Sequence, residues 1–372
     1  MELTPEIRAQ LEQQKQQCVF CKIVSKEVAS QIVFEDKFSL AILDIFPMVK
    51  GHSVFMLKEH YPIMPYIPTE EFKHLFGSLP QLSKAIQDAM VSPGSNIFIA
   101  NGWVAGQQAS HFLMHILPRE KGDGLFNFYF KPSFSLGEKE INLLAHHFPP
   151  MVHNHFKRNP AEWHKSSGEI PRFLKEIYEQ NIVLYEDEKV LVIIPKKGIA
   201  PGHIEVYSKT EEKDFTKLSV EDSTHIFFIT SLVATAIFEG LGAQGTNIIV
   251  KHGKIDDNPA GNLSFHVIPR KEGDHLQGLW QPSQKRPSYD LKKIANSIND
   301  KSWKVNYKEK KEEVKYYKTP VIKISSKSSE EEFKEQSSEQ RNKNSKLKIE
   351  ENEDTEETEE NEIASAIKKI RN

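Results

Sequence analysis

Two histidines in one short segment are the residues of this chain whose spacing most directly suggests chemistry. They are His111 and His115, in the segment 111–119 that reads HFLMHILPR. Side chains two residues apart in an extended strand point to the same face, so both imidazoles would flank position 113. A histidine there could act as a nucleophile, but Leu113 can neither attack nor carry a proton. The spacing therefore predicts a catalytic strand that has lost its central group.

The same pattern returns later in the chain with another residue in the middle. The segment 262–270 reads NLSFHVIPR, which places Ser264 where the first segment has Leu113 and retains His266. A serine and a histidine on one strand face could serve as nucleophile and base, but their spacing does not assure hydrogen-bond reach. The sequence also indicates no third group that would orient the base. His115, Ser264 and His266 remain catalytic candidates on these terms.

A metal site is suggested by the only two cysteines, Cys18 and Cys21. Their spacing lets one turn present two sulfurs to one ion, and tetrahedral zinc needs two further ligands. His60 and His111 are candidates for these ligands. A redox pair shares the cysteine spacing, but it leaves both histidines unexplained and lacks the helix-start context that lowers a thiol pKa. The pattern favours structural zinc over a redox pair or two inert cysteines.

An internal repeat positions these segments. A shift of 151 residues aligns Glu35 with Glu186 and His115 with His266. One constant offset over so long a stretch indicates two copies of one unit, which we call copy one and copy two. The same shift also pairs Gly51-His52 with Gly202-His203, Asn96 with Asn247, Gly102 with Gly253, and Pro118-Arg119 with Pro269-Arg270.

Each copy reads as five short strands and one long helix. Thr69 offers an N-cap for an amphipathic helix that ends at Met90, and Ser219 caps its counterpart. The predicted fold class is α+β, with a five-stranded antiparallel sheet in each copy. Pairing the exposed sheet edges would make an intramolecular pseudo-dimer with one continuous sheet. In copy one, apolar runs predict strands over residues 31–34, 40–43, 53–57, 96–100 and 111–117.

The chain divides into five predicted parts. Further helices are expected over 138–147 and 290–298, after the five strands of each copy. Five histidines near the first of them could form a second metal site or line a solvated helix face. They are His146, His147, His153, His155 and His164. The parts are an N-terminal helical extension (1–17), copy one (18–156), a linker (157–170), copy two (171–300) and a charged, mostly disordered tail (301–372).

The tail and the overall composition limit the classes of partner. Residues 350–362 are too acidic to bury a core, so the tail either solubilises the protein or docks a basic protein partner. Residues 363–370 could form a short amphipathic helix. The net charge of -3 gives no general attraction to nucleic acid or to anionic membranes. No apolar run approaches the ~20 residues of a membrane span, and residues 1–17 are too polar for a signal peptide. A cytoplasmic protein is expected.

Taken together, these motifs resemble the histidine triad (HIT) family of nucleotide-binding proteins, over roughly residues 18–125 and more faintly over 171–276. The resemblance implies two HIT-like domains and a metal site in which Cys18, Cys21, His60 and His111 hold zinc. Copy two would hold none, because Glu169, Arg172, Glu211 and Asn262 occupy the ligand positions. The resemblance depends on CVFCKI (18–23), FED (34–36), LDI (43–45), KGH (50–52), NG (101–102), AGQ (105–107) and the segment 111–119.

The resemblance also implies a nucleotide site. Asp44 would accept hydrogen bonds from ribose hydroxyls, and Asn101, Gln107 and the backbone at 108–109 would face the α-phosphate. His115 would donate to a phosphate oxygen. Each has an alternative: Asp44 could cap the turn before Pro47, Asn101 could adopt a left-handed conformation before Gly102, and His115 could pack in a strand. Pro195 replaces the ribose-binding acid in copy two.

The expected function follows from the middle histidine of the triad, which is the nucleophile in active members. With Leu113 and Ser264 there, the chain is expected to bind a purine nucleotide, or a nucleotide-like ligand, without efficient covalent catalysis. One alternative is an active nucleotidyl hydrolase or transferase that uses His115 or His266. Another is a non-catalytic scaffold that presents its acidic tail. Gly51-His52 is expected to begin a strand.

Overall fold

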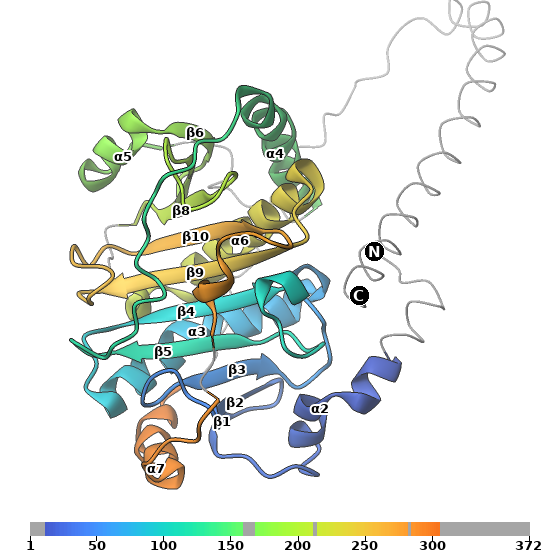
Figure 1. Ribbon diagram of the computed structural model, residues 1–372, viewed down its shortest axis with the longest axis vertical. Coiled ribbons are helices and arrows are strands. Elements are labelled where there is room, and N and C mark those ends of the chain that lie inside the picture. Colours follow the sequence, from blue (N-terminus) through green and yellow to red (C-terminus); the bar gives the residue numbers. More distant parts are fainter. Residues whose placement is uncertain (1–11, 159–167, 211–213, 282–283, 306–372) are drawn as a thin grey trace, which may run out of the picture. The chain divides into compact units, whose positions relative to one another are not determined.

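The fold is a single ten-stranded antiparallel sheet shared by the two copies. The computed structural model describes residues 12–158, 168–210, 214–281 and 284–305, and the structural statements below concern these residues. The strands lie in the order β1-β2-β3-β5-β4-β9-β10-β8-β7-β6 (Figure 1). Each copy contributes five strands, so the predicted α+β fold and the pairing of the copies in one sheet are confirmed.

The strands follow the apolar runs of the sequence closely. The one important difference concerns β5, which begins at Met114, so His111 and Leu113 precede it. Copy one contains β1 (Ile32–Glu35), β2 (Ser39–Leu43), β3 (Ser53–Leu57), β4 (Gly94–Asn101) and β5 (Met114–Arg119). Copy two contains β6 (Ile182–Glu186), β7 (Val190–Ile194), β8 (Ile204–Ser208), β9 (Gly245–Gly253) and β10 (Ser264–Arg270).

The two halves of the sheet meet where β4 pairs with β9 over the full length of β4. Gly94 lies opposite Gly253 at one end of this junction. A Cβ added at Gly94 would lie 2.4 Å from the carbonyl oxygen of His252, and one at Gly253 would lie 2.4 Å from that of Pro93. Glycine is required at both positions because the two backbones approach too closely for any side chain.

Two long helices cover one face of the sheet and pack against each other. They are α3 (Thr69–Met90) and α6 (Val220–Leu241). The rings of Phe76 and Phe227 stack between them at 4.5 Å. Ser219 caps α6 as predicted, whereas the N-cap of α3 is Pro68 and Thr69 is its first helical residue. By length and composition α6 could cross a membrane, but 56% of its most apolar window is buried, as in a core helix.

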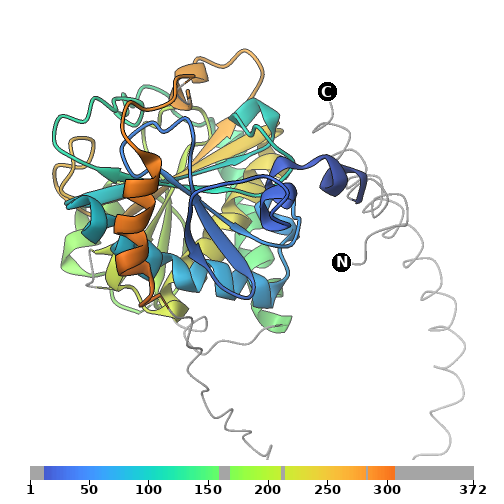
Figure 2. The same cartoon turned by 90° about the horizontal axis from the view of Figure 1, so that it is seen from below.

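The helices that follow the two copies exchange places. The helix α4 (Glu138–Arg158), which follows the strands of copy one, packs against α6 and β6 of copy two. The helix α7 (Leu291–Ser302), which follows copy two, packs against α3 and β1 of copy one, seen in orange in Figure 2. Asn299 and Ser302 also donate hydrogen bonds to the carbonyls of Ile32 and Val33. Each copy therefore completes the helical layer of the other.

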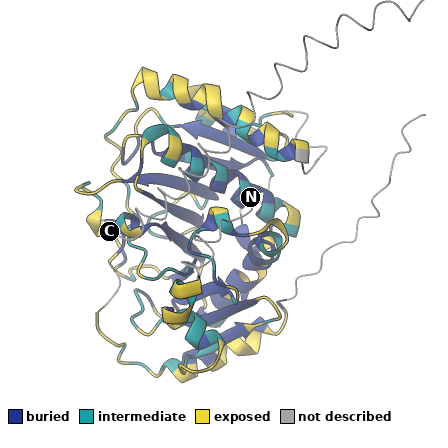
Figure 3. Ribbon diagram, turned by 90° about the vertical axis from the view of Figure 1, so that its right-hand side faces the viewer, coloured by how far each residue is buried: buried dark blue, intermediate teal, exposed yellow. Residues whose placement is uncertain are grey.

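The helix α4 is longer than expected because it continues past Pro149 and Pro150 to Arg158. Its buried residues recur every fourth position at Leu144, Phe148 and Val152, and this stripe faces copy two. Packing of that stripe outweighs the backbone hydrogen bonds that two prolines remove. Most residues between those of the stripe are exposed, and the ribbon in Figure 3 is yellow where residues are exposed.

The remaining elements are short. Residues 12–17 are helical, while residues 1–11 of the predicted N-terminal extension lie outside the described residues. The predicted tail is described only as far as residue 305. The short helices are α2 (Val19–Val24) and α5 (Lys175–Gln180), and the 3-10 turns are η1 (Met64–Tyr66), η2 (Trp103–Ala105), η4 (Arg172–Leu174), η5 (Phe215–Lys217) and η6 (Gln277–Leu279).

Candidate functional site

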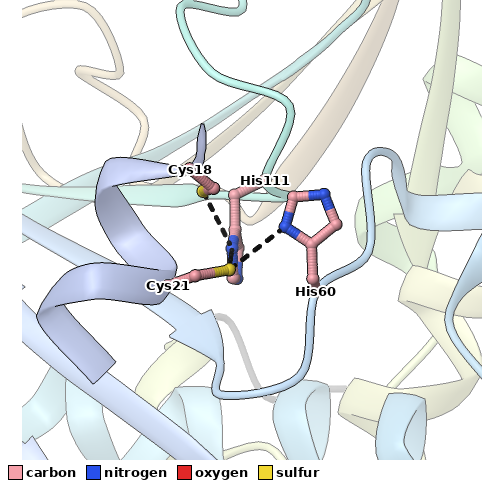
Figure 4. A group of neighbouring side chains, drawn as sticks. All are labelled: Cys18, Cys21, His60 and His111. Carbon is pink, nitrogen blue, oxygen red and sulfur yellow. Dashed lines mark hydrogen bonds between the residues drawn. The ribbon is translucent and has the colours of Figure 1, made fainter. Parts of the chain in front are cut away.

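The four predicted zinc ligands converge beside α2 (Figure 4). Cys18 precedes the helix and Cys21 lies in its first turn, while His60 follows β3 and His111 precedes β5. Cys21 Sγ lies 3.2 Å from His60 Nδ1 and 3.6 Å from His111 Nδ1, and Cys18 Sγ lies 3.6 Å from the same His111 atom. Because β5 begins only at Met114, His111 is free of the sheet and can face the two thiols.

The donor set fits a tetrahedral metal ion. At ordinary Zn–S and Zn–N bond lengths, ligand atoms around zinc lie about 3.5 Å apart, close to the separations found here. His111 Nε2 lies 2.9 Å from the Leu57 carbonyl, to which it donates a hydrogen bond. That bond leaves the Nδ1 lone pair of His111 directed at the thiols, as in metal sites with an oriented histidine. The cluster could bind zinc.

The environment of the thiols opposes a redox pair. Burial and the neighbouring Cys18 raise the pKa of the Cys21 thiol to about 12. Reactive thiols need the opposite shift, because the thiolate is the nucleophile. A bound metal would displace the proton, since zinc coordinates the thiolate.

A second group of side chains surrounds His115 on β5. His115 Nδ1 lies 3.0 Å from His52 Nε2, and His52 Nδ1 lies 3.8 Å from a carboxylate oxygen of Asp44. The Met48 backbone N–H donates to His52 Nδ1 over 3.3 Å. His52 therefore carries its proton on Nε2 and donates it to His115 Nδ1, which leaves the proton of His115 on Nε2. His115 is prepared to donate a hydrogen bond from Nε2.

The other predicted nucleotide-binding residues make hydrogen bonds within the protein. Asp44 accepts a bond from the Phe46 N–H through one oxygen and turns the other toward His52. Asn101 donates to Thr246 Oγ1 across the junction of the copies. Gln107 accepts from the Gly102 N–H and donates to the carbonyls of Pro62 and Ala109. The structure thus brings Asp44 and His115 together, whereas Asn101 and Gln107 stabilise loops; their ligand roles stay predictions.

Leu113 stands in apolar surroundings. It packs against a buried cluster that contains Ile42, Val54 and Met56. Trp280, from the end of copy two, stacks on Phe98 at 3.9 Å, with its ring 4.5 Å from that of His115. An equivalent contact is present in the other direction: the ring of Phe130, which follows the strands of copy one, lies 4.9 Å from that of His266 in copy two. Each histidine pair is covered by an aromatic ring from the segment that follows the other copy.

Copy two contains a hydrogen-bonded chain that the sequence did not indicate. Ser264 Oγ lies 3.0 Å from His266 Nε2, so the two residues are within reach after all. His266 Nδ1 lies 3.2 Å from His203 Nε2 and 3.4 Å from Glu205 Oε1. The expectation that no third group orients His266 is therefore wrong. Glu205 is its direct cross-strand partner on β8.

Two residues of these groups could have been found from the repeat. His52 was expected only to begin a strand, but β3 begins at Ser53 and the ring of His52 faces His115. The repeat retains His52 as His203 with the same offset that relates His115 to His266. The signal for Glu205 is its occurrence at the position of Val54, which strand pairing places beside the histidine.

The histidines around α4 do not form a metal cluster among the residues that the structure describes. His146, His147 and His153 are exposed on the helix, and His155 stacks on Phe228 at 3.8 Å. His164 lies outside the described residues. The solvated helix face therefore accounts for three of the five histidines.

Stability should fall as the pH is lowered below about 6.5, because several histidines are buried in the neutral form. Burial lowers the pKa of His52 to about 3, that of His203 to about 3 and that of His252 to about 4. Between these values and 6.5 the unfolded chain binds more protons than the folded one. Each such histidine then lowers the free energy of unfolding by about 1.4 kcal/mol for each pH unit of acidification in this range. Thermal unfolding at pH 7, 6 and 5 measures the effect.

The matched control for this pH dependence is His252→Gln, which removes one buried imidazole far from the cysteines in sequence. Any loss of metal at low pH is common to both proteins, so the difference between their slopes isolates the histidine. We expect a shallower slope for the variant. Equal slopes would contradict the assignment of His252 as a buried neutral base.

Comparisons with known proteins agree with the repeat and the fold. The HIT domain family model matches residues 25–122 and 176–273. An uncharacterized HIT-like protein of Methanocaldococcus jannaschii is 37% identical over 107 residues, 29% of this chain and 82% of that protein. The adenosine 5'-monophosphoramidase of Saccharomyces cerevisiae is 35% identical over 109 residues, 29% of this chain and 66% of that protein. A Zn-bound histidine triad family protein of Mycobacterium smegmatis is 32% identical with a TM-score of 0.28, over 30% of this chain and 81% of that one.

Proposed function

The chain belongs to the histidine triad (HIT) family, with two HIT domains, and we propose that its first domain binds a purine nucleotide or nucleotide-like ligand without efficient covalent catalysis. The observation that carries this proposal is the pair His52–His115 beside Asp44, next to an aliphatic Leu113. The groups that would hold a ligand are present, whereas the position of the nucleophile is occupied by a side chain that cannot attack phosphorus.

The binding chemistry follows from the protons of the site. His115 presents an Nε2–H, which can donate to a phosphate oxygen, and burial together with His52 lowers its pKa to about 3. The imidazole is therefore neutral at physiological pH and acts as a hydrogen-bond donor, not as a cation. Asp44 has one oxygen on the Phe46 N–H and one toward His52, a carboxylate that could accept a ribose hydroxyl. Zinc at Cys18, Cys21, His60 and His111 would brace the same domain.

The second domain then acts as a structural partner of the first. It extends the sheet through β9, and its following segment supplies Trp280 over His115. Adenosine nucleotides are reasonable first ligands, since the related yeast enzyme is named as an adenosine 5'-monophosphoramidase. Two further hypotheses stay predictions: a cytoplasmic location, and a scaffold role for residues 301–372, testable by pull-downs with and without that tail.

Isothermal titration of the zinc-loaded full chain with adenosine and guanosine monophosphates tests the binding proposal. We expect saturable heat for at least one of them and no bond formation to the protein by mass spectrometry. Asp44→Ala should weaken binding at least tenfold, since a bond to the ligand is lost. Glu138→Ala, on the exposed start of α4, serves as the control that leaves binding unchanged. The absence of heat up to millimolar nucleotide would exclude the proposal.

A further inference from the structure

Copy two differs from copy one in a concerted way around its histidine pair. The copies share the pair, as His52 with His115 and His203 with His266, at 3.0 and 3.2 Å. Around it, four apolar residues of copy one are replaced by groups that can ionise or form hydrogen bonds. These replacements are Val54 by Glu205, Met56 by Tyr207, Ala100 by Lys251 and Leu113 by Ser264.

These groups lie together on one face of neighbouring strands. Strand pairing places Glu205 of β8 opposite His266 of β10, and Lys251 of β9 opposite Ser264. Ser264 Oγ contacts His266 Nε2 at 3.0 Å, and His266 Nδ1 faces Glu205 Oε1 at 3.4 Å. Tyr207 donates its hydroxyl hydrogen to the other oxygen of Glu205 over 2.5 Å. The order is that of a serine, a base and an orienting carboxylate.

We propose that Ser264, His266 and Glu205 form a second site, in which an activated serine attacks uncharged carboxylic esters. This activity goes beyond nucleotide binding in the first domain and does not depend on it. Ser264 is the nucleophile, His266 is the base, and Glu205 is a positioning residue that acts through His266.

Glu205 decides which nitrogen of His266 carries the proton. In copy one Nε2 of His52 faces Nδ1 of His115 at 3.0 Å, so Nδ1 accepts and Nε2 holds the proton. In copy two a carboxylate faces Nδ1 of His266, and its charge favours the proton there. His203 Nε2 also faces this nitrogen, at 3.2 Å, but its imidazole is neutral, whereas the ionised carboxylate of Glu205 attracts the proton. Nε2 of His266 is then the acceptor that Ser264 needs.

The charge state of Glu205 supports this arrangement. Burial opposes ionisation of this carboxyl, but hydrogen bonds from His266 and Tyr207 and the attraction of both histidines outweigh it and hold its pKa at about 2. The group is therefore an anion at neutral pH. An anionic neighbour stabilises the imidazolium that forms when His266 accepts the serine proton.

The reaction balances with water as the only co-reactant. Ser264 Oγ forms a bond to the ester carbonyl carbon while its proton passes to His266 Nε2. The bond from that carbon to the alcohol oxygen then breaks, and the leaving alkoxide takes the proton from His266. Water, deprotonated by the same nitrogen, attacks the acyl carbon, and the acid departs as the proton returns to Ser264.

An uncharged substrate suits the surroundings better than a phosphate. The cation that copy two adds to this face, Lys251, is already paired with Asp257 at 3.3 Å and lies over the Phe130 ring at 3.6 Å. Glu205 adds a negative charge next to the base. That charge would repel a phosphate, and Lys251 is already paired with Asp257, whereas a neutral carbonyl beside Phe130 would not be repelled.

A similar contact elsewhere provides an internal control. Ser95 Oγ lies 2.6 Å from His252 Nε2 at the junction of the copies. Ser95 is 0% exposed and His252 is 1% exposed, whereas Ser264 is 8% exposed. A reagent that needs both an activated serine and access should therefore distinguish the two.

Labelling of the full-length, zinc-loaded protein with a fluorophosphonate, followed by peptide mapping, tests the proposal. Ser264 Oγ would bond to phosphorus as fluoride leaves. We expect one adduct per chain on Ser264, none after Ser264→Ala, and unchanged labelling after Ser95→Ala if that variant folds. Turnover of p-nitrophenyl acetate should disappear in Ser264→Ala. The absence of an adduct, or an adduct at another residue that persists in Ser264→Ala, would overturn the proposal.

Glu205→Gln separates positioning from packing. We expect labelling at least 100-fold slower and a changed pH profile of labelling, with the melting temperature measured in parallel, while Tyr207→Phe retains the pH profile. An equal rate in Glu205→Gln would exclude the role of the carboxylate.

If variants in copy two do not fold, Val54→Glu with Leu113→Ser rebuilds the array in copy one, and labelling should then appear at position 113. Failure of that folded variant to label would also count against the proposal.

A bound metal is the competing explanation of the same residues. The ligand atoms of His203, Glu205 and His266 lie within 4.8 Å of one another, close enough for one ion. A metal would occupy Nδ1 of His266 and Glu205 together. Metal analysis of the wild type and of Glu205→Gln decides: equal metal content supports the serine site, whereas a second ion that is lost with Glu205 overturns it.

Discussion

Exhaustive chelation should lower the melting temperature of this protein by more than any single core substitution. Structural zinc contributes on the order of 10 kcal/mol in small metal-dependent domains, whereas large-to-small core substitutions cost about 2–5 kcal/mol. The four ligands come from three separate segments, at α2, after β3 and before β5, so the ion would fasten three parts of copy one. Thermal unfolding with and without chelator, alongside metal analysis, measures the effect.

The control for chelation is the protein without its thiols. Cys18→Ser with Cys21→Ser should melt lower than the wild type and should no longer respond to chelator. Hydrogen exchange adds a local readout, since the amides of α2 should lose protection first. An unchanged melting curve, with zinc absent before and after treatment, would refute the assignment.

Much of the fold could be predicted from the sequence because each copy repeats one pattern. The constant offset predicted two paired copies, and short apolar runs placed the strands of copy one to within a few residues. The full length of α4 could not be predicted, because Pro149 and Pro150 suggest that the helix ends there. Only the buried stripe that includes Phe148 and Val152, packed on copy two, explains why the helix continues.

In the candidate site, too, features that depend on local sequence were predicted, whereas features that depend on strand pairing were not. The cysteines and histidines that could bind zinc were named from the cysteine spacing together with the family resemblance, and the structure brings them together. The role of His52 and that of Glu205 were not found, because each depends on which residue faces it from a neighbouring strand. The repeat marks Glu205 as a polar residue at the position of Val54, but strand register is set by tertiary pairing, and only the structure shows that it faces His266.

A central histidine placed in copy one should create nucleotidyl transfer, because Leu113 of the natural chain cannot act as the nucleophile. In a serine triad, removal of the nucleophile alone costs on the order of 10⁶ in turnover, so Leu113 should leave only background hydrolysis of a fluorogenic adenosine phosphoramidate. We expect Leu113→His to raise turnover at least 100-fold. The full factor is not expected, since Ile42, Val54 and Met56 around this position offer the new imidazole no orienting partner.

A second substitution, His115→Ala, distinguishes a first domain without catalytic activity from one that hydrolyses its ligand. His115 presents its Nε2–H beside position 113, so Leu113→His combined with His115→Ala should lose most of the gain. Trapping and mass spectrometry of the Leu113→His protein should detect a nucleotidyl adduct at position 113, and the wild type should show none. Wild-type turnover that disappears in His115→Ala would instead mean that the first domain catalyses hydrolysis without a protein nucleophile. In that case Leu113 would exclude the covalent route while His115 serves a directly attacking water.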